Sequence, residues 1–178
     1  MIRPRRSIRG LGRFFCAVGG FRGVLWKSAR GLYNPVMGFD LTNDCGTYLR
    51  FSPSGWALAL TIGERYGWKP EGTTLTESEA GTKGVHWSGE YATNDGQRAS
   101  AADARSLADA CERALSDPAY EARTTDTLNG IYEAIAQQSP CGRGDTPDRA
   151  IDPDVAKKFR VRLQELIAFC GEGSFIIE

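Results

Sequence analysis

The chain has 178 residues, of which 41% are hydrophobic and 25% charged, and this is the composition of a soluble globular protein with length for one domain. Its 22 basic and 22 acidic residues balance, yet residues 1–36 hold eight basic residues and no acid, which leaves residues 37–178 with a net charge of −8. A domain of that charge without a basic patch is not expected to bind nucleic acid, and no apolar run is long enough to span a membrane.

Residues 1–36 form a basic, glycine-rich segment without helical or alternating apolar periodicity. A secretory signal needs an unbroken apolar run, and here Gly19, Gly20 and Arg22 interrupt it. Three interpretations stay open: a disordered tail or mis-assigned upstream extension, a targeting peptide of the mitochondrial type, or an integral part of the fold. Because little apolar surface is present to offset the entropy of ordering, we expect disorder here and a single domain over residues 37–178.

Regular patterning begins at Met37. Residues 38–51 hold two short apolar runs on either side of a turn signal around Asn43-Asp44, which predicts a β-hairpin. Ser52-Pro53 then opens a helix, with the serine as N-cap and the proline at the first helical position. This helix ends near Gly67, and its apolar residues cover more than one face, so we expect it to be well buried.

A polar loop over residues 68–84 is followed by a predicted strand over residues 85–97, with Val85, Trp87 and Tyr91 on one face. The strand ends in the turn signal Asn94-Asp95-Gly96. Ser100 and Asp103 then form a capping-box pattern, in which the serine caps a free amide and the acid reaches back to the main chain. The amphipathic helix that follows ends at Asp117-Pro118.

The last third of the chain predicts two more helices and a strand. A helix over about 125–137 is weakened by Gly130, and residues 139–150 form a loop rich in proline and glycine. Asp152-Pro153 opens a helix over 153–170, and residues 174–178 form a terminal strand. The expected fold is therefore α+β, with about four helices packed on a small, mainly antiparallel sheet.

Several short motifs of the domain resemble a family of small, uncharacterised bacterial proteins. The motifs are "MGFDL" at 37–41, "GTYLRF" at 46–51, "GEYATNDGQ" at 89–97, "DARSLADACERAL" at 103–115 and "IAFCGEGSFII" at 167–177. Members of that family begin at MGFDL, carry the Asn-Asp-Gly turn before a helix, and close on a Phe-Cys…Gly-x-Phe segment. The resemblance implies that Met37 is the first residue of the working protein, and it implies no activity.

The five cysteines are scattered and odd in number: Cys16, Cys45, Cys111, Cys141 and Cys170. Such a set is not a disulfide framework and is typical of a reducing cytoplasm. No Cys-x-x-Cys or other zinc-ligand spacing is present, and the chain has a single histidine. We therefore expect neither a metal nor a cofactor.

His86 is the candidate for any acid–base role of histidine. Glu90 and Asp95 follow in the same stretch and are the carboxylates that a small hydrolase would combine with it. Asp40 would complete a carboxylate cluster of the kind that binds a metal or exchanges protons. The simpler interpretation is that His86 is an exposed strand residue and that Asp95 serves the turn.

Aromatic residues gather between residues 56 and 91: Trp56, Tyr66, Trp68, Trp87 and Tyr91. Aromatics in this number mostly form core, whereas Trp and Tyr on a surface are favoured anchors for a partner. Trp87, Tyr91 and Asp95 are the candidate binding residues. Together with the acidic charge of the domain, they predict a protein partner with a basic face.

Small size, acidic charge and the lack of a recognisable catalytic motif favour a cytoplasmic binding or inhibitory protein of the immunity or antitoxin kind over an enzyme. The alternative hypothesis is a small hydrolase that uses His86 with Glu90 or Asp95.

Overall fold

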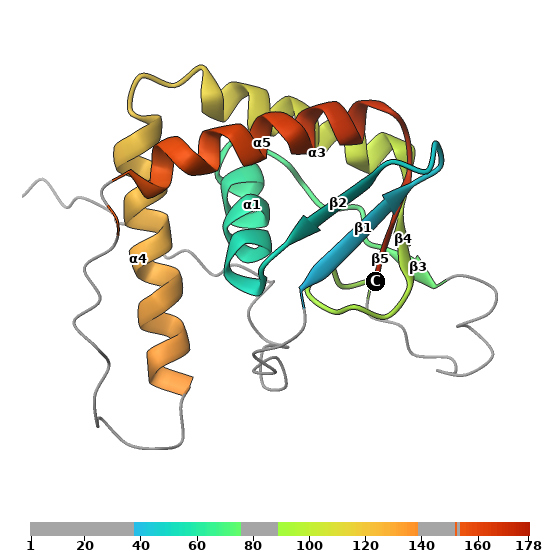
Figure 1. Cartoon of the computed structure of the whole chain (residues 1–178), viewed down its shortest axis with the longest axis horizontal. Helices are drawn as coiled ribbons and strands as arrows, with labels where there is room; N and C mark the ends of the chain where they lie inside the picture. Colours follow the sequence, from blue (N-terminus) through green and yellow to red (C-terminus); the bar gives the residue numbers. More distant parts are fainter. Residues whose placement is uncertain (1–37, 76–88, 139–151, 153) are drawn as a thin grey trace, which may run out of the picture.

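A computed structural model describes residues 38–75, 89–138, 152 and 154–178 (Figure 1). The predictions for residues 1–36, for His86 and Trp87, and for the loop at 139–150 lie outside the described residues. No helix among the described residues is long and apolar enough to cross a membrane.

Five strands form one antiparallel sheet in the order β2-β1-β5-β4-β3. In chain order they are β1 (Phe39–Asn43), β2 (Tyr48–Phe51), β3 (Thr74–Leu75), β4 (Gln97–Ala99) and β5 (Phe175–Ile177). The predicted hairpin is β1 and β2, with Leu41 opposite Leu49. β5 pairs with β1 on one side and β4 on the other, so the end of the domain lies in the middle of the sheet.

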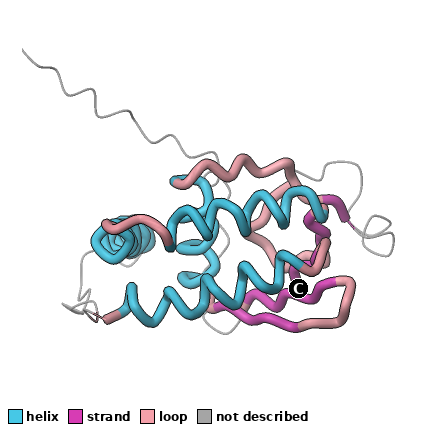
Figure 2. The backbone as a smooth tube through the Cα atoms, turned by 90° about the horizontal axis from the view of Figure 1, so that it is seen from above, coloured by secondary structure: helices cyan, strands magenta, loops and turns pink. Residues whose placement is uncertain are grey.

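In the part of the chain that the structure describes, four helices accompany this sheet, so the α+β prediction is confirmed. They are α1 (Pro53–Arg65), α3 (Ala101–Leu115), α4 (Tyr120–Gln138) and α5 (Val155–Gly171). Figure 1 shows α3 and α5 side by side, and α4 crosses near their end. In Figure 2, α4 is seen along its axis while α3 and α5 lie across the view.

One face of the sheet is buried. Successive residues of a strand point to opposite faces, and the buried residues alternate with less buried ones along the strands. The buried strand residues are Phe39, Leu41, Asn43, Leu49, Phe51, Gln97, Ala99, Phe175 and Ile177. Trp56 of α1 is 1% exposed and packs its ring against Phe51 at 5.6 Å and Phe39 at 6.1 Å between ring centroids. The indole therefore joins α1 to both strands of the hairpin, and it places this helix on the buried face.

The two predicted serine N-caps are confirmed. Ser52 Oγ accepts a hydrogen bond from Gly55 N at 3.1 Å, and Ser100 Oγ accepts one from Asp103 N at 3.0 Å. The last helix differs, because it begins at Val155 with Asp154 as its N-cap and has no side-chain cap bond. Asp152 lies two residues before this N-cap, and its carboxylate accepts a hydrogen bond from Asp154 N at 2.9 Å.

Two boundaries were predicted wrongly. Residues 89–96 are not a strand, because Gly89 (φ 74°) and Gly96 (φ 71°) adopt left-handed conformations that no strand accommodates, and the strand begins only at Gln97. The helix predicted over 125–137 begins five residues earlier, at Tyr120. Thr124 belongs to the buried face of this helix, but it is polar. The apolar periodicity of the sequence therefore does not extend to the first turn of the helix.

Candidate functional site

The predicted carboxylate cluster does not assemble into a metal centre. Asp40 on β1 accepts a hydrogen bond from the Tyr48 hydroxyl and pairs with Arg50 Nε at 3.4 Å. Glu90 and Asp95 lie in the loop before β4, where the Asp95 amide donates to Gln97 at 2.7 Å. Among the described residues, no group of three His, Cys, Asp or Glu side chains is placed to hold a metal ion.

Tyr91 is a core residue. Its side chain is 1% exposed, and its ring packs edge-on against Trp68 at 5.2 Å between centroids. Its hydroxyl donates to Asp103, and burial is the main cause that raises the pKa of the phenol. Tyr91 therefore has no surface to offer a partner, and of the candidate binding residues only Asp95 keeps a partly exposed position in the described chain.

The role predicted for the Asp103 side chain in the capping box is wrong. Instead of reaching back over the helix start, its carboxylate is 1% exposed and turns into the core. It accepts hydrogen bonds from Trp68 Nε1 at 2.9 Å, from the Glu71 amide at 3.3 Å and from the Tyr91 hydroxyl. A buried carboxylate with three donors is fully satisfied, and no reactant reaches it, so Asp103 holds the fold together.

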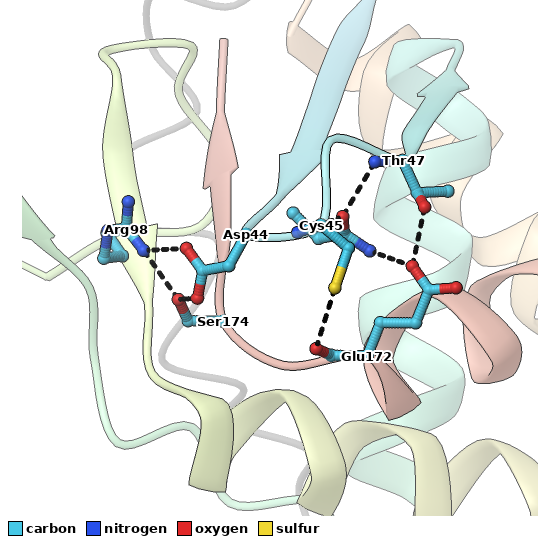
Figure 3. A network of polar contacts seen from close by, with 7 residues as sticks. Asp44, Cys45, Thr47, Arg98, Glu172 and Ser174 are labelled. Atoms are coloured by element: carbon cyan, nitrogen blue, oxygen red, sulfur yellow. Dashed lines mark hydrogen bonds and ion pairs between the residues drawn. The ribbon is translucent and has the colours of Figure 1, made fainter.

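A second polar network ties the β1–β2 turn to the connection between α5 and β5 (Figure 3). Asp44 accepts hydrogen bonds from Arg98 at 2.5 Å and from the Ser174 hydroxyl, and these two bonds lower the pKa of its carboxyl. On the other side of the turn, Glu172 accepts from Asn43 Nδ2 and from Thr47 Oγ1, both at 2.6 Å.

These contacts also lower the pKa of Glu172, with the Thr47 hydroxyl as the larger cause. The Cys45 Sγ lies 3.9 Å from the Glu172 carbonyl oxygen and is exposed. The donors of this network are engaged with the acceptors beside them. We call these contacts the turn network, because they fix the β1–β2 turn to the connection between α5 and β5.

A marked excess of acidic over basic residues lies along α3 and α4. Residues 101–134 contain seven acids and three bases. The acids are Asp103, Asp109, Glu112, Asp117, Glu121, Asp126 and Glu133, and the bases are Arg105, Arg113 and Arg123. All of these side chains are exposed except the buried Asp103 and the half-buried Asp117. This segment accounts for about half of the negative charge of the domain.

A shallow hollow of about 430 Å³ opens at the end of α3, and we call it the α3 hollow. It is lined by Asp109, Glu112, Arg113, Ser116 and Asp117. The C-terminal end of a helix carries a partial negative charge, which adds to that of the carboxylates.

The charged groups of the α3 hollow differ in their partners. Arg113 turns its guanidinium to the Tyr66 carbonyl, with Nε at 2.9 Å. Asp117 accepts from the Tyr66 hydroxyl at 2.6 Å and pairs with Arg123 at 3.1 Å, and the tyrosine bond is the main cause that lowers its pKa. Among the described residues, no ion pair or side-chain hydrogen bond engages Asp109 or Glu112.

Comparison of the chain with protein-family models, with curated proteins and with solved structures gave no match. The resemblance to the MGFDL family therefore stays a prediction.

Proposed function

We propose that this protein binds another protein with a basic face at the α3 hollow, as an inhibitory protein of the immunity or antitoxin kind does. The observation that supports this proposal is the pair of exposed carboxylates at Asp109 and Glu112, which lie beside each other on α3 and have no partner in the part of the chain that the structure describes. Residues three apart on a helix point in nearly the same direction, so the two charges reinforce one another.

A lysine or arginine side chain from the partner fits the chemistry of this hollow. It would meet two carboxylates that have no partner among the described residues and the negative end of α3, while Arg113, which also lines the hollow, is engaged with the Tyr66 carbonyl. Charge of one sign at a binding surface raises the rate of association and makes it sensitive to salt. We expect such a protein to act in the cytoplasm of a bacterium, without nucleic acid or membrane as a ligand.

The test is capture of a partner from native lysate by the full chain and by two variants with equal changes in charge. Asp109→Asn with Glu112→Gln removes both unpaired carboxylates of the hollow. Asp126→Asn with Glu133→Gln removes two exposed carboxylates of α4 and serves as the matched control.

We expect one stoichiometric partner whose affinity falls at least about tenfold in the hollow variant and less than threefold in the control. Raising the salt concentration weakens the wild-type complex and reduces the difference in affinity between the hollow variant and the control. Equal affinity of the wild type and the hollow variant contradicts the proposal, and so does an equal loss in both variants.

A further inference from the structure

The sheet has a free edge at β2. The strand order begins with β2, and among the described residues no strand pairs with its outer side. In an antiparallel pair, the main-chain groups of successive residues point alternately to the two sides of the strand. Asp40 exchanges both main-chain hydrogen bonds with the residue that follows β5, so the groups of Leu41 point the other way, to Leu49 of β2. Tyr48 and Arg50, on either side of Leu49, therefore direct their main-chain groups out of the sheet.

Such an edge is a template for another strand, because its outward N–H and C=O groups can pair with a second chain. The edge of β2 matches that of a second copy of this protein. If two β2 strands met antiparallel about a two-fold axis at Leu49, Tyr48 of each copy would lie opposite Arg50 of the other, and each such pair would exchange two hydrogen bonds. Tyr48 and Phe51 also belong to the residue types that favour strands. An edge of this kind needs a device that prevents the pairing.

Arg162 of α5 lies over this edge. One nitrogen of its guanidinium, Nη2, donates to the carbonyl oxygen of Arg50, which is one of the outward acceptors. The guanidinium carbon is 5.0 Å from the centre of the Phe51 ring, and Nη1 pairs with Glu165 on the same helix. An arginine suits these three contacts, because its guanidinium is planar, stacks on aromatic rings and carries five donors.

We propose that Arg162 blocks the edge of β2 and thereby keeps two copies of this protein from joining their sheets. A strand that paired with β2 would displace the guanidinium from the Arg50 carbonyl or bury its charge, and both cost free energy. Without Arg162, the Arg50 carbonyl is open to the Tyr48 amide of a second copy, and the Phe51 ring loses the group that covers it. This device does not depend on the binding proposed at the α3 hollow, with which it shares no residue.

Two leucine variants test the proposal, with the molecular mass measured by sedimentation equilibrium. Arg162→Leu removes the guanidinium from the edge. Arg105→Leu makes the same change at an exposed arginine of α3 and serves as the matched control. We expect Arg162→Leu to double in mass at concentrations where the wild type and Arg105→Leu keep the mass they share. Hydrogen exchange is the local measurement: the amides of Tyr48 and Arg50 exchange severalfold more slowly in the Arg162→Leu dimer than in the wild type.

Arg50→Pro identifies the strand that pairs. It removes an N–H that points out of the sheet, so the hydrogen bonds between β1 and β2 remain. Added to Arg162→Leu, it is expected to restore the mass of the wild type. The proposal is overturned if Arg162→Leu keeps the wild-type mass, if Arg105→Leu associates equally, or if the association survives Arg50→Pro. Loss of the helices of Arg162→Leu in circular dichroism overturns it as well, because Arg162 would then hold the fold together.

Discussion

The two sides of α3 use the same chemical group in opposite ways. On the inner side, the Asp103 carboxylate is buried and receives three hydrogen bonds. On the outer side, Asp109 and Glu112 are exposed and line the α3 hollow. An acid that accepts donors in a medium from which water is excluded stabilises the fold, whereas an unpaired acid in water is available to a partner. Substitutions on the two sides are therefore expected to separate stability from binding.

The largest effect is expected at Asp103. Asp103→Asn keeps the size of the side chain but presents an amide NH₂ group to donors that need an acceptor, so the free energy of unfolding falls by about 3 kcal/mol. Urea unfolding followed by tryptophan fluorescence measures this loss. Tyr91→Phe removes one of the three donors, and its loss of about 1 kcal/mol is the comparison. A value for Asp103→Asn no larger than that of Tyr91→Phe contradicts the role given to the carboxylate.

The next largest loss of stability is expected at Gly63, where α1 packs closely on α3. Gly63 of α1 is buried, and a Cβ there would lie 2.6 Å from Leu107 Cδ1 and 3.3 Å from the Trp68 ring. Gly63→Ala therefore displaces the buried Leu107 side chain and lowers the free energy of unfolding by about 2 kcal/mol, despite the better helix propensity of alanine. Unchanged stability would show that the helices have room for a methyl group.

Gly130 of α4 is the matched control for Gly63, because it is also a glycine inside a helix. It is exposed, and a Cβ there would meet nothing within 4 Å. Gly130→Ala is expected to raise the free energy of unfolding by about 1 kcal/mol, since it limits the unfolded chain without a clash. The same urea experiment measures both glycine variants, and they are expected to shift the midpoint in opposite directions.

A smaller effect on stability is expected from Glu172→Gln, because Glu172 lies in the exposed turn network. The pKa of Glu172 is lowered in the folded protein, so its contribution is present above the unfolded pKa of about 4 and is lost as the pH falls through the folded value. The melting temperature of Glu172→Gln is therefore slightly below that of the wild type at pH 7, and the difference between the two narrows as the pH falls below about 4. A difference that persists in acid would mean that charge is not its cause.

The parts of the fold that depend on neighbouring residues could be predicted from the sequence. The hairpin and the caps at Ser52 and Ser100 follow from signals within a few residues, and the structure has each of them. The role of Asp103 could not be predicted in this way, because its partners Trp68 and Tyr91 lie 35 and 12 residues away. The same local pattern, a serine followed three residues later by an acid, occurs whether the acid caps the helix or points into the core.

The α3 hollow shows the same limit. The sequence predicts an acidic domain, but it does not tell which carboxylates stay unpaired. Arg113 stands four residues after Asp109, a spacing at which side chains of a helix can meet, yet it turns to the carbonyl of Tyr66, 47 residues away. Only the packing of α1 against α3 brings that carbonyl within reach. Asp109 is left without this arginine for that reason.

The most direct test of the contrast between the two sides of α3 is the free energy of unfolding of Asp109→Asn with Glu112→Gln at low salt. If these carboxylates serve a partner and not the fold, the isolated variant stays within about 0.5 kcal/mol of the wild type, on the stabilising side, because a repulsion at the C-terminal end of the helix is removed. A loss of more than about 1 kcal/mol would contradict the account, since it would show that the outer carboxylates of α3 hold the fold as Asp103 does.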